Sequence, residues 1–414
     1  MRILIITQYF WPENFRINEV SEELVKLGHE VSILTGYPNY PKGEIYPEFK
    51  KDYKKFSYYK GAEIIRVPLL ARKKNKANLI LNYISFLINS IIFGYFKLKG
   101  KKLDIIFTCQ LSPVTIGVTS AFFAKMLNIP QVFWVQDLWP DTLVALKILK
   151  KNWQISLFKI LINWIYSRCD LILAQSKNIQ KEIEKYPSVK DNIYYVPTWG
   201  ESNLFKKVSS LAPEIKRKKI FTIMFAGNIG EAQDFPNLIK AVQHLAFIKV
   251  VNFRIIIIGD GSKKEWVISE VKNLNIEKYF EFYNSYPVER MPSFFRHADA
   301  LLVNLLNKKV FNMTIPGKIP FYLASGIPII GMICGEGAEI IKKSKSGLVC
   351  DSGDYKNLSK IILKMINLDK LALKEMGLNG QKYALKEFSK VKLINKLNKI
   401  LMRKDNKKFK IRKK

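Results

Sequence analysis

The chain of 414 residues is poor in the side chains that most often carry nucleophilic, redox or metal chemistry. Its three histidines lack the neighbours expected of a nucleophile–base pair or a metal site. Its four cysteines lie far apart without Cys-x-x-Cys spacing, which argues against a zinc ion or a redox pair. The chain opens directly on an apolar strand, so we expect no signal peptide and a reducing, cytosolic setting.

Acidic residues are also scarce. The sequence has 35 Asp and Glu against 68 Lys and Arg, which gives a formal net charge of +33. No Asp-x-Asp pair occurs, so the sequence does not indicate a carboxylate-held metal ion bridging a diphosphate. The positive charge indicates an anionic partner: a membrane surface, a nucleic acid or an anionic substrate. No nucleic-acid-binding motif is present, so we expect no nucleic acid partner.

Apolar sequence, in contrast, is plentiful: 48% of the residues are hydrophobic, which is enough for real cores. A chain of this length usually forms two domains. Apolar runs alternate with helical patterns, an order typical of parallel βαβ units. The expected strands of a first series are residues 2–7, 31–36, 102–109, 131–137, 170–175 and 192–198. Those of a second series are residues 220–227, 251–261, 279–284, 298–305 and 327–330.

The sequence therefore predicts an α/β fold with two Rossmann-like, doubly wound parallel-sheet domains. Ligands of such sheets bind beyond the carboxyl ends of the strands, so we expect the two domains to face a cleft that binds the ligand. Residues 202–219 are interpreted as the linker between the two series. The expected parts are an N-terminal domain (1–205), a C-terminal domain (206–382), a helix returning to the N-terminal domain (383–401) and a basic tail (402–414).

Residues 79–96 form the longest apolar segment and are long enough to be tested as a membrane-spanning helix. Within and beside this segment, Asn78, Asn82, Ser85 and Asn89 fall at helical spacing and form one polar stripe. We therefore expect a helix lying on the domain, with apolar surface to spare for a bilayer interface, although an ordinary buried helix fits almost as well. The basic flanks favour the membrane, because Lys and Arg attract anionic headgroups.

Residues 224–242 read as a strand, a loop of small and polar residues, and then a helix. Gly227 and Gly230 would let backbone amides approach an anion at the helix start, and Asn228 and Gln233 could donate neutral hydrogen bonds to it. A second strand ends at Gly259 in the same way. A plain strand-to-helix turn explains either loop equally well.

Residues 314–330 are the most informative stretch. Pro316 suits the first turn of a helix that Gly326 ends, which would place Lys318 near the helix N-terminus. A cation there opposes the helix dipole, so it makes sense only beside an anion such as a diphosphate. Glu336 and Glu339 follow at the start of the next helix, where they could hold sugar hydroxyls or simply complement the helix dipole.

A third candidate group follows the strand at 131–137. Gln136 and Asp137 would bring an amide and a carboxylate to the carboxyl end of that strand. Trp139 could stack on a sugar, but core packing explains a tryptophan there equally well.

The order of these segments resembles that of the family 4-type glycosyltransferases with the GT-B fold, over nearly the whole chain. Within that family the chain is most similar to a bacterial subgroup of O-antigen, capsule and colanic-acid transferases, the WbuB/WcaI-like proteins. The segments that carry the resemblance are "TGYPNYPKG" (35–43), "LSP" (111–113), "VQDLWPD" (135–141), "GNIGEAQ" (227–233), "TIPGK" (314–318) and "GEGAEII" (335–341).

The resemblance implies metal-independent, retaining transfer of a sugar from a nucleotide-diphosphate donor, expected to be UDP-linked, to a lipid-linked saccharide. The protein would work in surface polysaccharide biosynthesis as a peripheral protein on the cytoplasmic face of the cell membrane. The resemblance implies no cofactor, because the nucleotide sugar is a substrate. It also implies no metal ion. The implied catalytic residues are Asp137, Lys318 and Glu336. The implied donor-binding residues are Gly227, Asn228, Gly230, Gln233, Gly259, Lys318, Glu336 and Glu339. On the acceptor side the resemblance implies Asn14, Arg16, Asn39, Tyr40, Gln136 and Trp139.

The chain departs from the family pattern at five positions and in the N-terminal glycine loop, which reads "PENFRIN" (12–18) here. Met313 and Phe321 stand where the family has the two glutamates of its Glu-x7-Glu motif, the second of which holds the donor ribose. Gln136 replaces the usual histidine, and Asn228 with Gln233 replaces a basic pair that binds the diphosphate, a loss for which Lys318 could compensate. Two alternatives therefore stay open: a nucleotide-sugar epimerase of the same fold and a non-catalytic partner protein.

Overall fold

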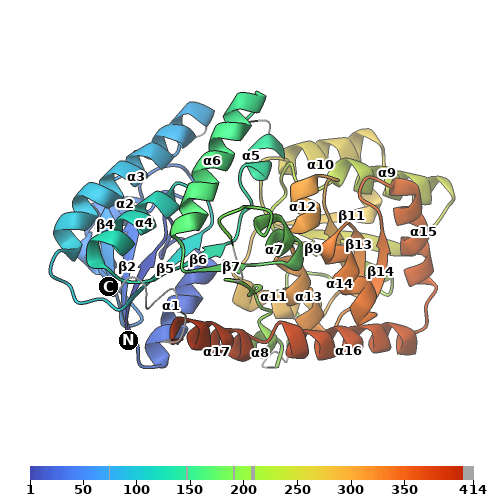
Figure 1. Ribbon diagram of the computed structural model, residues 1–414. Helices are drawn as coiled ribbons and strands as arrows, with labels where there is room; N and C mark the ends of the chain where they lie inside the picture. The colour runs from blue at the N-terminus through green and yellow to red at the C-terminus, as the bar shows by residue number, and fades with distance from the viewer. Residues whose placement is uncertain (74, 146–147, 190–191, 207–209, 404–414) are drawn as a thin grey trace. The chain divides into compact units, whose positions relative to one another are not determined.

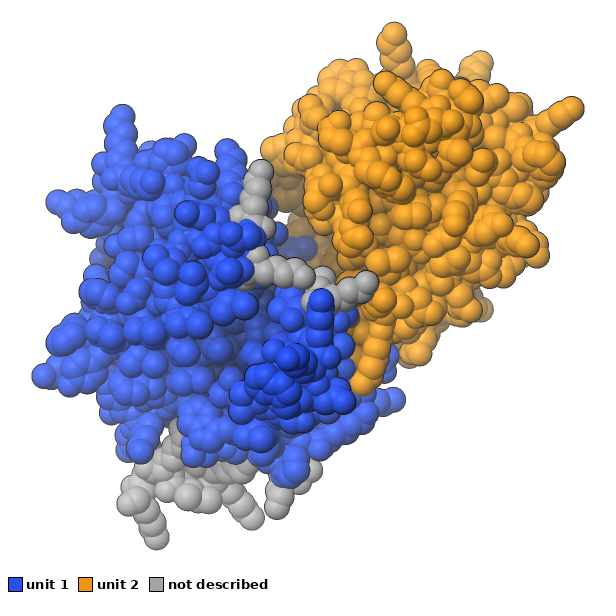
Figure 2. Space-filling view, turned by 90° about the horizontal axis from the view of Figure 1, so that it is seen from above, with its two compact units in different colours: residues 1–196, 393–414 blue, residues 197–392 orange. Residues whose placement is uncertain are grey.

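The computed structural model describes residues 1–73, 75–145, 148–189, 192–206 and 210–403. The chain forms two compact units (Figure 2): residues 1–196 with 393–414 make unit 1, and residues 197–392 make unit 2. Unit 1 thus gives way to unit 2 after Val196, whereas the boundary expected from the sequence follows residue 205. Each unit is built around its own sheet, as the two series of strands predicted.

The sheet of unit 1 has eight strands in the order β3-β4-β2-β1-β5-β6-β7-β8, parallel except for the pair β3–β4. Its central strands are fully buried, which is typical of a parallel sheet covered by helices on both faces. The sequence missed β3 and β4. The strands are β1 (Arg2–Ile6), β2 (Glu30–Gly36), β3 (Tyr58–Tyr59), β4 (Ala62–Val67), β5 (Ile105–Gln110), β6 (Gln131–Val135), β7 (Leu171–Ala174) and β8 (Ile193–Tyr195).

The helices of unit 1 lie between these strands in the chain, except for α17, which follows the last strand of unit 2 (Figure 1). They are α1 (Arg16–Lys26), α2 (Pro47–Lys51), α3 (Lys76–Leu98), α4 (Ile116–Leu127), α5 (Asp141–Ala145), α6 (Asn152–Arg168), α7 (Lys177–Ile183) and, from Leu393 onward, α17 (Lys390–Leu401). The helix predicted at 79–96 is confirmed as α3 and is longer than expected. Its start is capped by Asn75, whose side chain accepts a hydrogen bond from the backbone N–H of Asn78.

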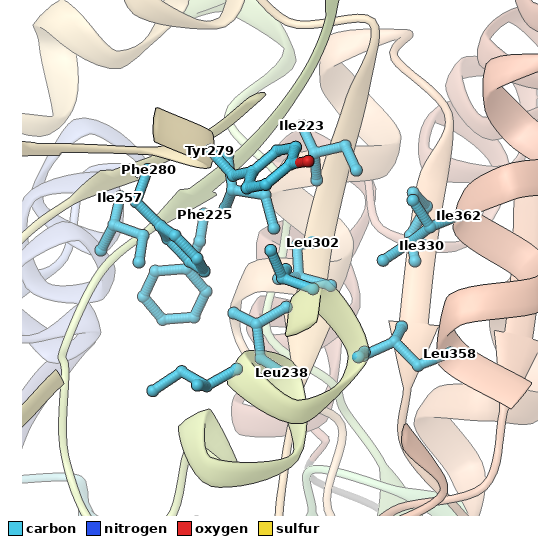
Figure 3. Packing of buried hydrophobic residues seen from close by; sticks show 14 of the residues in the cluster. Ile223, Phe225, Leu238, Ile257, Tyr279, Phe280, Leu302, Ile330, Leu358 and Ile362 are labelled. Carbon is cyan, nitrogen blue, oxygen red and sulfur yellow. The ribbon is translucent and has the colours of Figure 1, made fainter. Parts of the chain in front are cut away.

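The sheet of unit 2 has six parallel strands in the order β11-β10-β9-β12-β13-β14. The strands are β9 (Phe221–Ala226), β10 (Phe253–Ile258), β11 (Phe280–Tyr283), β12 (Ala300–Asn304), β13 (Ile329–Met332) and β14 (Gly347–Cys350). The helices are α8 (Ser202–Lys206), α9 (Phe235–Phe247), α10 (Lys264–Asn273), α11 (Met291–Phe295), α12 (Lys309–Met313), α13 (Lys318–Ser325), α14 (Glu336–Ser344), α15 (Tyr355–Ile366) and α16 (Lys370–Glu387). Figure 3 shows core side chains of β9, β10 and β12 meeting those of α9 and α15.

The interpretation of residues 202–219 as a linker is wrong, because the described residues 210–219 pack onto unit 2. Ala212 and Ile215 are only 1% and 4% exposed. Glu214 accepts two hydrogen bonds from the guanidinium of Arg290, at 2.7 and 3.0 Å. The segment therefore belongs to the folded surface of unit 2, which its polar composition concealed.

The single helix expected over 383–401 is also wrong. α16 ends at Glu387 and α17 begins at Lys390. The break occurs because Phe388 is buried and its carbonyl accepts a hydrogen bond from Gly200 N–H at 3.1 Å, beside a parallel bridge between Gly200 and Ser389. Most of the expected basic tail, residues 404–414, lies outside the described residues.

Candidate active site

Two glycine turns at the carboxyl ends of β9 and β10 lie directly against each other in unit 2. Gly227 and Gly259 have φ angles of +133° and +151°, which strongly favour glycine. A Cβ atom at Gly259 would lie 1.9 Å from the carbonyl oxygen of Gly227, so no other residue fits without moving the loop. Gly227 N–H donates to Ile258 at 2.9 Å and Ile229 N–H donates to Asp260 at 2.8 Å. The two turns thus form one rigid ledge, which leaves Gly227 exposed.

The polar side chains of the first turn brace that turn themselves. Gln233 Oε1 accepts hydrogen bonds from Gly230 N–H at 3.0 Å and from the side-chain amide of Asn228 at 3.4 Å. Asp234, the residue before α9, is buried and bonds to the side chain of Asn237. A carboxylate therefore already stands at the start of α9, where the sequence analysis expected an anionic ligand. The donor contacts predicted for Asn228 and Gln233 stay predictions, since their recorded bonds hold the loop.

Lys318 is the first residue of α13, as the sequence predicted, and its half-buried side chain crosses the ledge. Its Nζ lies 3.3 Å from the centroid of the Phe225 ring, and a Cβ on Gly227 would lie 2.8 Å from its Cε. Within the described ranges, no carboxylate pairs with this ammonium group and no hydrogen bond to it is recorded. Burial lowers the pKa of Lys318 well below its usual range, because the charged form lacks solvation.

This combination is a good receptor for an anion. A partly desolvated cation without a partner is costly, and an anionic ligand would remove that cost. The N-terminus of α13 adds a positive potential in the same place, because the dipole of a helix is positive at that end. A diphosphate lying on the ledge at the exposed Gly227 would reach both the Lys318 ammonium and the N-terminus of α13.

Glu336 and Glu339 lie in the first turn of α14, but they differ in solvent exposure. Glu336 is 5% exposed, whereas Glu339 is exposed. A Cβ atom at Gly337 would lie 2.8 Å from Ile319 and 3.1 Å from Pro316, so the starts of α13 and α14 are adjacent. The structure thus brings the segment with Lys318 beside the segment with Glu336, as a shared donor site requires.

The two positions of the expected family glutamates are apolar and buried. Phe321 is 8% exposed, and its ring lies 5.0 Å from that of Phe205 and 5.7 Å from that of Phe295. Met313 is 7% exposed. A carboxylate at position 321 would be desolvated among aromatic rings, so this departure from the family pattern fits a repacked core around α13.

In unit 1, the carboxylate of Asp137 is held by side chains of its own segment and by Ser112. It accepts hydrogen bonds from Thr142 Oγ1 at 2.5 Å and from Trp139 Nε1 at 3.2 Å, while burial raises its pKa. The proposed sugar stacking of Trp139 is contradicted, because the ring is 4% exposed and packs against Tyr83 and Phe158. Trp139 therefore positions Asp137 and fills the core of unit 1.

Gln136, next to Asp137, has a buried side-chain nitrogen without a hydrogen-bond partner among the described residues. Its backbone carbonyl accepts a hydrogen bond from the side chain of Gln175 at 3.1 Å. Its predicted contact with the acceptor stays a prediction.

The other acceptor-side residues fall into two groups. Arg16 pairs with Glu19 at 2.7 Å on α1, and Asn14 is exposed on the loop before it. Asn39 is fully buried, and its amide joins the backbone of Tyr37 and Arg72, so direct contact with an acceptor is contradicted. Tyr40 is 36% exposed and remains a candidate. Three neighbouring side chains surround its ring: Tyr9, Phe15 and Arg72.

Glu13 is a site residue that the sequence analysis missed. It is 2% exposed, and its carboxylate accepts hydrogen bonds from the backbone N–H groups of Asn39 at 2.8 Å, Tyr40 at 2.7 Å and Phe10 at 3.2 Å. Glu13 thereby fixes the loop that carries Tyr40. Burial raises its pKa to about 7, although the three hydrogen bonds act in the opposite direction. No sequence signal pointed to it, because a glutamate between Pro12 and Asn14 is equally compatible with an exposed loop.

The raised pKa makes stability depend on pH. Folded protein binds the Glu13 proton more tightly than unfolded protein does. The contribution of this proton to the free energy of unfolding is therefore fully present below the ordinary pKa of 4.5, and it is lost as the pH rises through about 7. We expect Glu13→Gln to remove about 3 kcal/mol of pH dependence between pH 4.5 and 8. Urea unfolding of both proteins across this range measures it. Equal slopes in the two proteins would contradict the assignment.

Comparisons with known proteins place the chain in a class. The family described as Glycosyltransferase Family 4 matches residues 15–199, and the family described as Glycosyl transferases group 1 matches residues 211–383. Together with the two parallel sheets, these matches identify the chain as a GT-B glycosyltransferase.

Particular relatives fit the expected subgroup. The chain is 24% identical to the colanic acid biosynthesis glycosyl transferase WcaI of Escherichia coli (strain K12), over 79% of this chain and 82% of WcaI. The crystal structure of WaaG, a glycosyltransferase involved in lipopolysaccharide biosynthesis, has a TM-score of 0.67 at 12% identity and covers 97% of this chain and 100% of WaaG. Anabaena HepE in complex with UDP and glucose has a TM-score of 0.69 at 13% identity, with coverages of 97% and 99%. The chain is thus similar in sequence to a colanic acid biosynthesis glycosyl transferase, and it shares its fold with the two solved structures.

Proposed function

We propose that the protein transfers a sugar from a UDP-linked donor to a lipid-linked saccharide in surface polysaccharide biosynthesis, with retention of configuration and without a metal ion. The observation that carries the proposal is the half-buried ammonium of Lys318 at the start of α13. It has no acidic partner in the part of the chain that the structure describes, and it lies against the exposed Gly227. A departing nucleoside diphosphate needs its growing negative charge stabilised, and preorganised groups do this best. The choice of UDP is supported by HepE, which was crystallised with UDP.

In this proposal each group of residues has a separate role in binding the donor or the acceptor. Gly227 and Gly259 let the diphosphate approach the backbone, and Lys318 with the first N–H groups of α13 neutralises it. Glu336, at the start of the neighbouring helix, would orient the donor sugar through its hydroxyls. Asp137 and Gln136 of unit 1 would meet the reacting sugars, and Tyr40 with Asn14 and Arg16 would contact the acceptor. The protein would act on the cytoplasmic side of the cell membrane, as a peripheral protein.

The test is a transfer assay with UDP-, GDP- and dTDP-sugars and short undecaprenyl-diphosphate-linked saccharides, run with and without EDTA. We expect UDP release with elongation of the lipid at the same rate in both conditions, because Lys318 takes the role of a metal ion. Transfer that EDTA abolishes and Mg²⁺ restores would contradict the metal-independent mechanism. Release from GDP- or dTDP-sugars alone would overturn the choice of UDP.

A further inference from the structure

Helix α3 is amphipathic in the opposite sense to a core helix. Its polar stripe faces the protein: Asn82 is fully buried and donates to the carbonyl of Leu70, and Asn89 donates to the carbonyl of Pro68. Most of its isoleucines face outward together with Phe96, with Ile84 46%, Ile88 49% and Phe96 73% exposed, whereas Phe86 and Leu98 are buried. Among the described residues, α3 is also the one helix long and apolar enough to cross a membrane, with 22% of that stretch buried.

A second helix exposes an apolar stripe in the same way. On α6, Trp153, Leu157, Ile160 and Trp164 follow one another at helical spacing and are 63%, 59%, 67% and 39% exposed. No pattern in the sequence alone distinguished this stripe from a core-facing one.

Helix α4 joins α3 and α6 into one surface (Figure 1). Ser90 of α3 and Thr119 of α4 share a buried hydrogen bond of 2.8 Å, and Gly117 of α4 lies directly against Ile165 of α6. A groove of about 490 Å³ runs between the three helices, lined by apolar side chains together with Lys125, Asn128 and Arg168. We call the outer face of α3, α4 and α6 the apolar–basic face.

The charge of the apolar–basic face indicates which kind of partner it binds. None of the three helices contains an aspartate or glutamate. Exposed basic residues stand on or beside them: Lys97, Lys99, Lys125, Lys151, Lys159 and Arg168. By contrast, α1 carries three glutamates. Exposed apolar side chains set among cations, without acids, match a surface with an apolar interior and anionic headgroups.

We propose that the apolar–basic face docks unit 1 onto an anionic phospholipid bilayer, with α3 and α6 lying in the interface. Tryptophan and phenylalanine side chains enter the headgroup region, and the groove accepts an acyl chain while Lys125 and Arg168 meet its phosphate. The bonds from Asn82 and Asn89 keep α3 against unit 1, so α3 lies on the membrane and does not cross it. This deepens the proposed function, whose acceptor is lipid-linked, but does not depend on the identity of the donor.

The test is co-sedimentation of the full chain with vesicles of phosphatidylcholine, with and without phosphatidylglycerol. We expect binding to the anionic vesicles that weakens at high salt. The double variants Ile88→Ser/Phe96→Ser on α3 and Trp153→Ser/Ile160→Ser on α6 should each bind at least about tenfold more weakly, because each loses two apolar contacts with lipid. Phe247→Ser and Leu371→Ser, at positions 82% and 78% exposed in unit 2, are matched controls that should bind like the wild type.

Three outcomes would overturn the proposal. The first is that the face variants bind vesicles as well as the wild type does. The second is that light scattering finds a dimer that the face variants dissociate, which would make the face a subunit interface. The third is that the protein resists alkaline extraction from membranes, which would show that α3 crosses them. Transfer to a water-soluble acceptor saccharide separates this proposal from the enzymatic one. Face variants should keep that transfer, whereas absence of transfer in the wild type, with normal vesicle binding, would contradict the proposed function alone.

Discussion

Replacing Lys318 with methionine should lower kcat/KM for sugar transfer by about 10²- to 10³-fold, the usual effect of removing one preorganised group that stabilises charge. Methionine keeps much of the side-chain volume over the Phe225 ring but cannot neutralise a diphosphate. The same change should leave the melting temperature unchanged or raise it, because it removes a partly desolvated cation without an ion-pair partner among the described residues. Steady-state kinetics with differential scanning calorimetry measures both effects.

A nearby lysine provides the control. Lys263 stands beside the second glycine turn but pairs with Glu231 at 2.9 Å, and its side chain is 38% exposed. Lys263→Met should change kcat/KM by less than about threefold, since exposed ion pairs contribute little. If Lys318→Met behaves like Lys263→Met, the assignment of Lys318 to the diphosphate is wrong.

The pH dependence of UDP binding is a second readout of Lys318. Burial lowers the pKa of this lysine in the free protein, and a bound diphosphate would raise it again. Above the lowered pKa, binding should therefore be accompanied by proton uptake and should weaken as the pH rises. Calorimetry in two buffers of different ionisation enthalpy detects this uptake, which Lys318→Met should abolish.

Replacing Gly259 with alanine should be the most damaging single change to the glycine ledge. The new Cβ atom would lie 1.9 Å from the carbonyl oxygen of Gly227, at a φ of +151° that alanine rarely adopts. We expect a loss of about 3 kcal/mol in the free energy of unfolding, from strain and the displaced loop. UDP binding should be lost as well, because the turn at Gly227 would move away from Lys318.

Gly317→Ala is the matched control for stability. Gly317 has a φ of −56° and no atom within 4 Å of a new Cβ. Alanine there should leave stability unchanged or raise it by about 0.5 kcal/mol. Urea unfolding of both variants and calorimetric titration with UDP provide the measurements. A Gly259→Ala protein as stable as the wild type would show that the two turns are not packed as described.

The features that the sequence predicted well are local ones. The unit β1–α1–β2 could be recognised because an apolar run, a helical period and a second apolar run follow each other within 36 residues. Lys318 could be placed at a helix start because Pro316 and Gly326 mark the two ends of one short helix. In both cases the deciding residues are neighbours in the chain.

Features that depend on residues far apart in the chain could not be predicted in this way. Glu13 holds a loop 26 residues further along, and nothing in its own segment indicates that partner. The stripe on α6 looks the same in the sequence whether it faces a core or a membrane. Trp139 is another such case, since a tryptophan beside a candidate carboxylate fits either stacking on a sugar or packing against Tyr83 and Phe158.

The sequence by itself thus determined the repeated βαβ order of both units, the glycine turns that end β9 and β10, and the lysine at the start of α13. Only the tertiary structure decided which of these groups meet: that Lys318 lies on the Gly227–Gly259 ledge without an acidic partner among the described residues, and that α3 turns its asparagines inward and its isoleucines outward. The physical reason is that periodicity and turn chemistry act between neighbours in the chain. Burial and charge pairing depend on residues that only folding brings together.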